Sequence, residues 1–275
     1  MSKPIHRIIR VKETDRLDTL AREGILLNKI ISTGMLAVIL LAVSGCGLNK
    51  KQIDEAHAHY VLGLSYLREH KISQSLTEFK QAEEIDSKDP EIQSALGQAY
   101  HLKEAYPEAE KHYLDAIKYS HSDPKNLNNL AALYLDMKRW DDAIRYFRAA
   151  ADSLVFDRQE VPIAGMGYAF YQKGDYLQAV TEYKRAIELN SHYAPAYLGL
   201  GQAYYALDKT DDAVAQYREA LNIAPNYAQA YYYLGLAQIK LRQKEEAIAS
   251  FEEVVRLLPD SEIGHLAKDH LKILQ

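Results

Sequence analysis

Two stretches of this chain decide its fold, because one closely repeats the other. Residues 194–207 read APAYLGLGQAYYAL, and 34 residues later residues 228–241 read AQAYYYLGLAQIKL. Both are rich in Ala and Tyr, and both carry a Leu-Gly pair followed by apolar residues. Self-similarity at a fixed period of this length indicates an architecture of repeated, stacked units.

The same pattern of small residues recurs six times along the 275-residue chain. A first small residue follows a large apolar one, a second lies twelve residues later, and a third lies seven residues after that. The first positions are Gly63, Gly97, Ala131, Gly167, Gly201 and Gly235. The second are Ser75, Ala109, Ala143, Ala179, Ala213 and Ala247, and the third are Ala82, Ala116, Ala150, Ala186, Ala220 and Val254.

This spacing resembles the tetratricopeptide repeat, in which each 34-residue unit is a helix hairpin and the small residues lie where helices approach closely. The resemblance implies an all-α, right-handed superhelical solenoid of six hairpins over residues 56–261, followed by a capping helix over 262–275. The predicted repeats are 56–89, 90–123, 124–159, 160–193, 194–227 and 228–261. The third repeat is two residues longer than the others, so we expect either a longer second helix or a bulged turn at its end.

Composition and motifs restrict the classes of function. The chain is 48% hydrophobic and 26% charged with a formal net charge of −5, and no run of like charges offers a handle for nucleic acid. None of the sequence signatures of nucleophilic hydrolases, P-loops, zinc proteases or dinucleotide-binding folds is present, and His57 and His59 lack the spacing of a helical metal pair. We expect a non-catalytic protein without cofactor, metal or small-molecule substrate.

The single cysteine, Cys46, indicates where the mature protein begins. Residues 30–43 form a short apolar block that matches the hydrophobic part of a signal peptide, and Ser44, Gly45 and Cys46 follow it. This arrangement resembles the lipobox of bacterial lipoproteins. The resemblance implies a signal peptide over 1–45, an acylated Cys46 and a lipidated tether over 46–55. In that family an Asp directly after the cysteine favours retention in the inner membrane. Gly47 stands at this position here, so the resemblance also implies an outer-membrane anchor facing the periplasm.

The first 25 residues fit a signal peptide poorly. They contain four acidic residues among the basic ones, and we hypothesise that translation begins near Leu26 or Leu27. The alternative reading of the whole N-terminal segment is an uncleaved inner-membrane anchor.

The first helix of each hairpin is expected to line a concave groove, and the residues at its inward positions are unusually rich in tyrosine. The candidate binding residues are Tyr60, Leu64, Leu67, Asn129, Tyr168, Tyr171, Leu198, Tyr205, Tyr232, Tyr233 and Leu236. Such a surface suits an amphipathic helix or an extended apolar peptide. The alternative is that these side chains only pack against one another or against a neighbouring helix.

Some repeat proteins of this family grip a C-terminal carboxylate with a basic array. Here the corresponding positions hold Tyr60, Leu64 and Ala95, and only Lys125 and Asn129 match, so we expect no such clamp.

A lipobox followed by six repeats resembles the pilotin-type lipoproteins of type IV pilus biogenesis. The closest local similarity runs from Asn128 to Tyr134, through Lys138, Arg139 and Trp140, into the long end of the third repeat. The resemblance implies a scaffold that helps an outer-membrane secretin to assemble. The alternatives are a periplasmic adaptor for cell-wall hydrolases or another envelope complex, and a cytoplasmic or inner-membrane scaffold.

Overall fold

The computed structural model describes residues 48–153 and 155–274 of the chain. Over these residues it contains 13 helices and no strand. The predicted all-α solenoid of six hairpins and a final helix is therefore confirmed. The predicted signal peptide and Cys46 lie outside the described residues.

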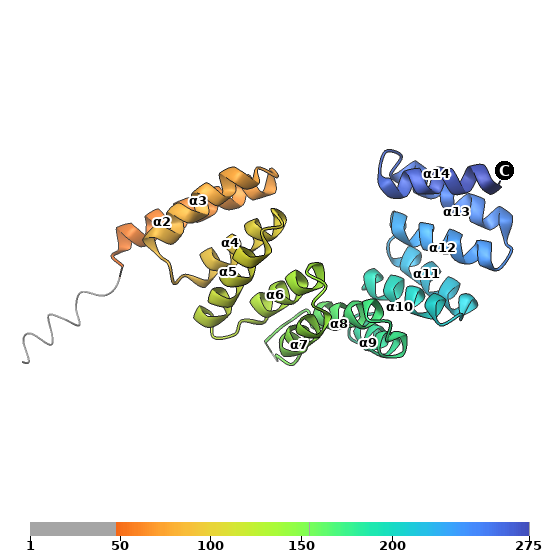
Figure 1. Ribbon diagram of the computed structural model, residues 1–275, viewed down its shortest axis with the longest axis horizontal. Helices are drawn as coiled ribbons and strands as arrows, with labels where there is room; N and C mark the ends of the chain where they lie inside the picture. Colours follow the sequence, from red (N-terminus) through yellow and green to blue (C-terminus); the bar gives the residue numbers. More distant parts are fainter. Residues whose placement is uncertain (1–47, 154, 275) are drawn as a thin grey trace, which may run out of the picture. The chain divides into compact units, whose positions relative to one another are not determined.

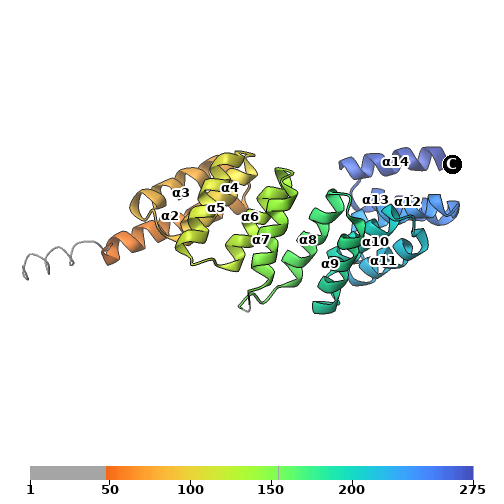
Figure 2. The ribbon, with the colours of Figure 1, turned by 60° about the horizontal axis from the view of Figure 1, so that its bottom comes forward.

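Successive helices pair into hairpins, and the hairpins stack in the order of the sequence (Figures 1 and 2). The first helices of the pairs are α2 (Lys50–Arg68), α4 (Pro90–Leu102), α6 (Pro124–Asp136), α8 (Glu160–Gln172), α10 (Ala194–Ala206) and α12 (Ala228–Lys240). The second helices are α3 (Ile72–Ile85), α5 (Tyr106–Tyr119), α7 (Trp140–Ala151), α9 (Tyr176–Leu189), α11 (Thr210–Ile223) and α13 (Lys244–Leu257). The last helix is α14 (Glu262–Leu274).

Helix starts and turns follow from local chemistry. The carboxylates of Asp89 and Asp123 accept hydrogen bonds from backbone N–H groups in the first turns of α4 and α6, and Pro90 and Pro124 occupy the first helical positions. Within each hairpin the turn contains one residue with positive φ. These residues are His70, Glu104, Lys138, Gly174, Asp208 and Arg242. Only one of the six is glycine, so five hairpins adopt a left-handed turn that a side chain disfavours.

The repeated small residues make the close contacts between helices. The second and third small residues of every repeat are completely buried, from Ser75 and Ala82 in the first repeat to Ala247 and Val254 in the last. At the first position a Cβ on Gly201 would lie 2.4 Å from the ring of Tyr217. The pattern read in the sequence therefore marks positions where helices pack closely together.

The two extra residues of the third repeat lie in the turn at its end. Helix α7 has 12 residues, whereas the other helices that close a hairpin have 14. The chain from 152 to 159 then leads to α8, and the Gln159 amide donates to the Ser153 carbonyl across it at 3.1 Å. Of the two expected outcomes, the bulged turn is the one observed.

The N-terminal end of the described chain differs from the predicted tether. Helix α2 begins at Lys50, so residues 50–55 of the segment predicted as a tether are helical. Contacts divide the chain into Met1–Asp54 and Glu55–Gln275, and the stacked hairpins belong to the second unit.

At the C-terminal end α14 covers α13, with Ala267 fully buried and the His270 ring stacked on Phe251 at 4.8 Å. No helix in the described residues is both long and apolar enough to cross a bilayer.

Candidate protein-binding groove

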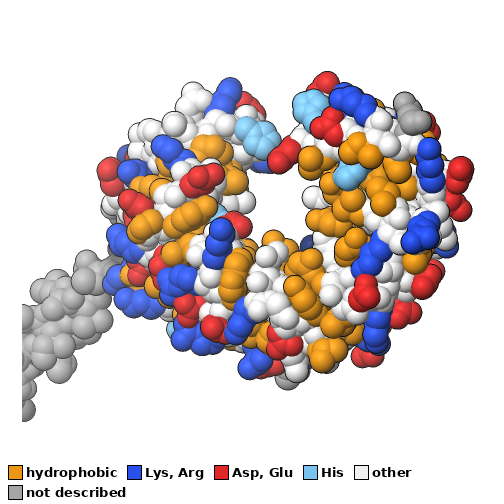
Figure 3. Space-filling model, turned by 45° about the vertical axis from the view of Figure 1, so that its right-hand side comes forward, with side chains coloured by type: hydrophobic (Ala, Val, Ile, Leu, Met, Phe, Trp, Pro, Cys, Tyr) orange, Lys and Arg blue, Asp and Glu red, His pale blue; other side chains and the backbone are white. Residues whose placement is uncertain are grey.

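The stacked hairpins of Glu55–Gln275 curve around an open hollow. In the space-filling view hydrophobic side chains gather along part of its inner side (Figure 3). A cleft of about 470 Å³ opens on the first helices of the third to sixth repeats, and residues of α6, α8, α10 and α12 line it. We refer to it as the tyrosine cleft.

Two glycines make the tyrosine cleft deep. Gly165 on α8 and Gly199 on α10 each lie two residues before the small residue of their repeat, at a position directed into the groove. A Cβ on Gly199 would lie 2.2 Å from Cζ of Tyr183, and one on Gly165 would lie 2.6 Å from Cζ of Phe147. The rings of the preceding hairpins therefore come up under these glycines and form the floor of the cleft.

Tyrosines form the walls of the tyrosine cleft. Tyr168 is 41% exposed, and Tyr193, Tyr227 and Tyr233 line the same space. Burial raises the pKa of the Tyr193 and Tyr227 hydroxyls above the ordinary value, so these groups stay protonated and neutral at physiological pH. Among the described residues that line the cleft, none is Asp, Glu, Lys, Arg or His.

One polar atom at the edge of the tyrosine cleft lacks a partner. The Oδ1 atom of Asn128, on α6, is buried and accepts no hydrogen bond from the described residues. A buried carbonyl oxygen without a donor lowers the stability of the folded protein. Because this atom is covered, the surface that the cleft offers to a bound group is mainly apolar.

A second cleft of about 650 Å³ adjoins the first on the second and third repeats. Its lining includes His101, Glu104, Asn129 and Asp136, and Ala132 of α6 lines both clefts. His101 Nε2 lies 2.6 Å from Asp136 Oδ2, while 60% of the Asp136 side chain remains exposed. We refer to it as the acidic cleft because two carboxylates border it.

Four of the eleven predicted groove residues line the two clefts. Tyr168, Leu198 and Tyr233 lie in the tyrosine cleft, and Asn129 lies in the acidic cleft. The structure brings these four residues to one continuous surface.

The other seven predicted groove residues are found in packing contacts. Three of them, Tyr60, Leu64 and Leu67, pack on the core between the first two hairpins. Tyr171 lies 5.4 Å from the Tyr176 ring, and Lys240 lies 4.6 Å above the Tyr205 ring. Tyr232 and Leu236 pack under the final helix α14.

Sequence reasoning missed the glycines and two of the tyrosines of the tyrosine cleft. Among the six repeats, glycine occurs at this inward position only in the fourth and fifth, as Gly165 and Gly199. Tyr193 and Tyr227 lie at the residue before α10 and α12, 34 residues apart. A comparison of inward positions between repeats would have revealed both signals.

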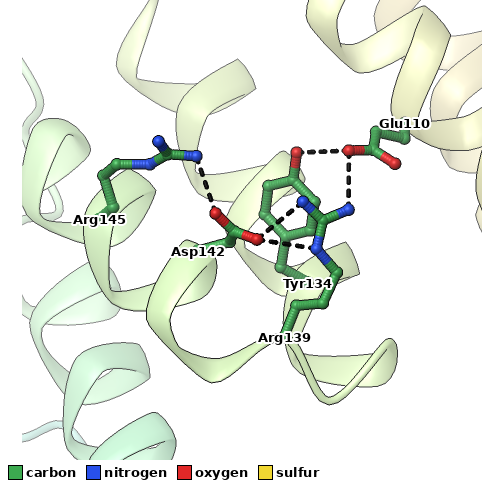
Figure 4. A network of polar contacts seen from close by, with 5 residues as sticks. All are labelled: Glu110, Tyr134, Arg139, Asp142 and Arg145. Carbon is green, nitrogen blue, oxygen red and sulfur yellow. Dashed lines mark hydrogen bonds and ion pairs between the residues drawn. The ribbon is translucent and has the colours of Figure 1, made fainter.

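A polar network outside the clefts links the second and third hairpins (Figure 4). Glu110 on α5 accepts hydrogen bonds from Tyr134 Oη at 2.7 Å and from Arg139 Nη1 at 2.9 Å. Arg139 also pairs with Asp142 and lies 4.2 Å above the Tyr134 ring, and Asp142 pairs with Arg145. These contacts fix adjacent hairpins in register.

Two of the described histidines make polar contacts far apart from each other. His59 Nδ1 lies 2.7 Å from Glu78 Oε2, and His112 Nδ1 lies 2.7 Å from Gln93 Oε1. Within residues 48–153 and 155–274, no three His, Cys, Asp or Glu side chains group as metal ligands.

Comparisons with known families match the repeats found in the sequence. The family described as TPR repeat matches residues 63–104, 167–208 and 201–241. Families described as tetratricopeptide repeat match residues 127–162 and 228–261.

The chain is also similar to proteins of type IV pilus biogenesis. It is 27% identical over 139 residues to the type IV pilus assembly protein PilF of Pseudomonas aeruginosa, a match that covers 50% of this chain and 55% of that protein. The chain thus spans about half the length of this curated relative.

Solved structures share the fold at lower identity. A structure from the functional characterisation of Pseudomonas aeruginosa PilF superposes with a TM-score of 0.66 at 18% identity, and covers 80% of this chain and 100% of that one. PilW, a widely conserved type IV pilus biogenesis factor, gives a TM-score of 0.69 at 15% identity over 78% of this chain and 98% of that one. The resemblance expected from the sequence is confirmed.

Proposed function

This chain belongs to the tetratricopeptide repeat family, and from that premise we propose that it is a non-catalytic scaffold that holds a segment of a partner protein in its concave groove. The observation that carries the proposal is the tyrosine cleft. Gly165 and Gly199 open a space walled by neutral tyrosines, and nothing in the chain's own described side chains fills it. Tyrosine supplies a large contact area at low conformational cost and a hydroxyl for the partner's backbone.

We further propose that acylation of Cys46 anchors the scaffold to the outer membrane on its periplasmic side. Two or three acyl chains contribute about 0.8 kcal/mol per buried methylene, which is enough for stable attachment. The mechanism is passive display: the anchor raises the local concentration of a captured partner near the membrane. Support comes from the sequence around Cys46 and from similarity to envelope proteins of pilus assembly.

The proposed partner is an outer-membrane secretin of a type IV pilus. Similarity to PilF in sequence and to PilW in fold supports this assignment. Deleting the gene tests it: secretin multimers should disappear from the outer membrane, and complementation should restore them. Normal multimers and normal pili in the deletion strain would contradict the pilus role.

A periplasmic adaptor for another envelope complex is the second candidate. The general repeat families match residues 167–261 without interruption, and the tyrosine cleft lies mostly on these repeats. In this case the deletion leaves secretin multimers intact and destabilises a different complex, which comparative proteomics of the membrane fraction would identify.

The groove itself is tested by a substitution that leaves the fold intact. Tyr168→Ala removes an exposed cleft wall, and we expect the protein to recover its partner from detergent-solubilised envelopes at least about fivefold less well. Leu177→Ala is the matched control, because Leu177 is 68% exposed on α9 and does not line the cleft. Equal recovery by wild type and Tyr168→Ala, with unchanged helical circular dichroism, would contradict binding in the groove.

The anchor requires a separate experiment. Cells grown with a radioactive or clickable palmitate analogue should label the wild-type protein, and Cys46→Ser should abolish the label and release the protein from membranes. Labelling that persists in Cys46→Ser would contradict the proposed lipid attachment.

A further inference from the structure

The first hairpin exposes an apolar face that is buried in each of the other five. Leu62 on α2 is 42% exposed, and its neighbour Val61 is 45% exposed. The residues that correspond to Leu62 in the later repeats are at most 6% exposed, and they are Leu96, Leu130, Met166, Leu200 and Leu234. The hairpin of α2 and α3 stands at one end of the stack, and no described hairpin precedes it (Figure 1). We refer to the exposed side of α2, formed by Ala58, Val61 and Leu62, as the end face.

The stacking contacts of later repeats show what such a face receives. In the fifth repeat Gly199 stands at the position of Val61, and the ring of Tyr183 from the preceding second helix lies against it. In the sixth repeat Tyr233 stands there and stacks on Tyr217 of the preceding second helix, with the ring centroids 6.1 Å apart. The position that Val61 leaves exposed is thus one that meets an aromatic ring elsewhere in the stack.

The second helices share a pair of residues that makes these contacts. Each of the five that precede another hairpin carries a buried aromatic residue, and a completely buried alanine follows three residues later, on the same side of the helix. The aromatic residues are Phe79, Tyr113, Phe147, Tyr183 and Tyr217. The surface complementary to the end face is therefore that of an amphipathic helix with an aromatic residue and an alanine three positions apart.

The chain itself does not supply a helix of this kind to the end face. Residues 1–49 contain no Phe, Trp or Tyr. In the described second helices the aromatic residue is already buried in the stack, and α14 packs on Phe251 of the last one. A second copy of the chain would have to open its own stack to offer such a surface, so the complementary helix belongs to a different protein.

We propose that the end face docks an amphipathic helix of a partner protein, which lies along α2 and directs an aromatic ring and, three residues later, an alanine toward Val61 and Leu62. The docked helix continues the stacking interface that joins the six hairpins. Among the described residues that line the two clefts none belongs to α2, so this surface is separate from the groove and the inference goes beyond the proposed function.

A peptide with the sequence of α9 is a probe of defined chemistry. It carries Tyr183 and Ala186, and a lactam between the exposed side chains of Lys184 and Glu188 holds it helical on the opposite side. Fluorescence anisotropy should show saturable binding of this peptide to the full chain in detergent. The same peptide with Tyr183→Ala should bind at least about tenfold more weakly, because it lacks the aromatic anchor.

A charge on the end face tests where the peptide binds. Leu62→Lys should weaken the α9 peptide at least about tenfold, because the ammonium group would be covered without a counter-ion. Leu266→Lys is the matched control, since Leu266 is 44% exposed on α14 and should leave binding unchanged. Both positions are exposed, so helical circular dichroism should be the same in both variants. Absence of saturable binding to wild type, or equal binding by Leu62→Lys, would overturn the inference.

Photo-crosslinking in living cells identifies the natural occupant. Benzoylphenylalanine at Val61 should form an adduct with one protein, and mass spectrometry should map it to an amphipathic segment with an aromatic residue and an alanine three positions apart. An adduct of the chain with itself, with phospholipid or with a segment that lacks this pair would overturn the inference, as would the absence of any adduct.

Two measurements separate this inference from the proposed function. Leu62→Lys should leave recovery of the groove partner unchanged, and Tyr168→Ala should leave binding of the α9 peptide unchanged. Loss of peptide binding in Tyr168→Ala would place the peptide in the groove and overturn this inference. Unchanged recovery of the groove partner by Tyr168→Ala would contradict the groove function alone.

Discussion

At the scale of single residues, one repeat position sets the depth of the groove. Two residues before the small residue of each repeat the chain carries, in order, Val61, Ala95, Asn129, Gly165, Gly199 and Tyr233. Only the two consecutive glycines let the rings of Phe147 and Tyr183 reach the groove surface. The tyrosine cleft is therefore a consequence of two missing side chains.

Gly199→Ala should destabilise the protein. The added Cβ would lie 2.2 Å from Cζ of Tyr183, a ring that is nearly fully buried and has little room to move. We expect the free energy of unfolding to fall by about 1–3 kcal/mol, measured by urea denaturation. Gln202→Ala, on the same helix and lining the same cleft, serves as the control and should change stability by less than about 0.5 kcal/mol. Equal stabilities of Gly199→Ala and wild type would show that the ring is not confined.

Arg242→Gly should stabilise the protein. Arg242 adopts φ 61° in the turn between α12 and α13, a conformation that costs a residue with a side chain about 1–2 kcal/mol. Removing the side chain is expected to raise the melting temperature, measured by circular dichroism. Arg242→Ala truncates the side chain but retains the strained Cβ, so it should give no gain. If both variants have the same melting temperature, the turn is not strained.

At the scale of secondary-structure elements, side-chain networks connect adjacent hairpins. Glu110 of α5 reaches Tyr134 and Arg139 of the next hairpin, and the Tyr134 side chain is only 2% exposed (Figure 4). Removing the Glu110 carboxylate leaves the buried Tyr134 hydroxyl without its acceptor, whereas removing both groups leaves no unpaired hydroxyl.

A double-mutant cycle measures this connection. Glu110→Ala and Tyr134→Phe should each lower the free energy of unfolding by about 1 kcal/mol. The double variant should lose less than the sum of the two by at least about 0.5 kcal/mol. Additive effects within error would mean that the hydrogen bond between α5 and α6 does not contribute to stability.

His112 should make the second hairpin sensitive to acid. Burial lowers the pKa of His112 below its ordinary value of 6.5, against the opposing effect of Glu83. The folded state therefore binds this proton less readily than the unfolded state, and stability falls as pH decreases below about 6.5. The slope from one group is at most about 1.4 kcal/mol per pH unit.

Replacing His112 isolates its contribution. His112→Gln retains a polar partner for Gln93, and its free energy of unfolding should vary less between pH 7 and pH 5 than that of wild type. The variants are compared by denaturation at each pH, because the chain has other histidines that both proteins share. Parallel pH profiles would contradict a depressed pKa at His112.

The same scale shows what the sequence could predict. The period of small residues predicts the hairpins, because residues such as Ala143 and Ala213 lie fully buried where helices pack together. The groove was less predictable. Tyr168 and Tyr232 both occupy positions expected to face the groove, but Tyr232 packs with residues of α14 whereas Tyr168 lines the cleft, and that difference depends on contacts between distant elements.

At the scale of the whole molecule, the stacked hairpins form one continuous cleft from several repeats. The tyrosine cleft takes its lining from four hairpins, so no single repeat could form it. The shape of the cleft therefore depends on the relative placement of the hairpins, which the polar networks and the small residues maintain.

The central claim is that a partner segment lies in the groove between α6 and α12. Site-specific photo-crosslinking in living cells tests it most directly, with benzoylphenylalanine placed at Tyr168 in the cleft or at Leu177 outside it. We predict that ultraviolet light joins one defined protein to the Tyr168 position and that the deletion of that protein removes the adduct, while the Leu177 position gives no such adduct. An adduct with the same protein at Leu177 and none at Tyr168 would contradict the account.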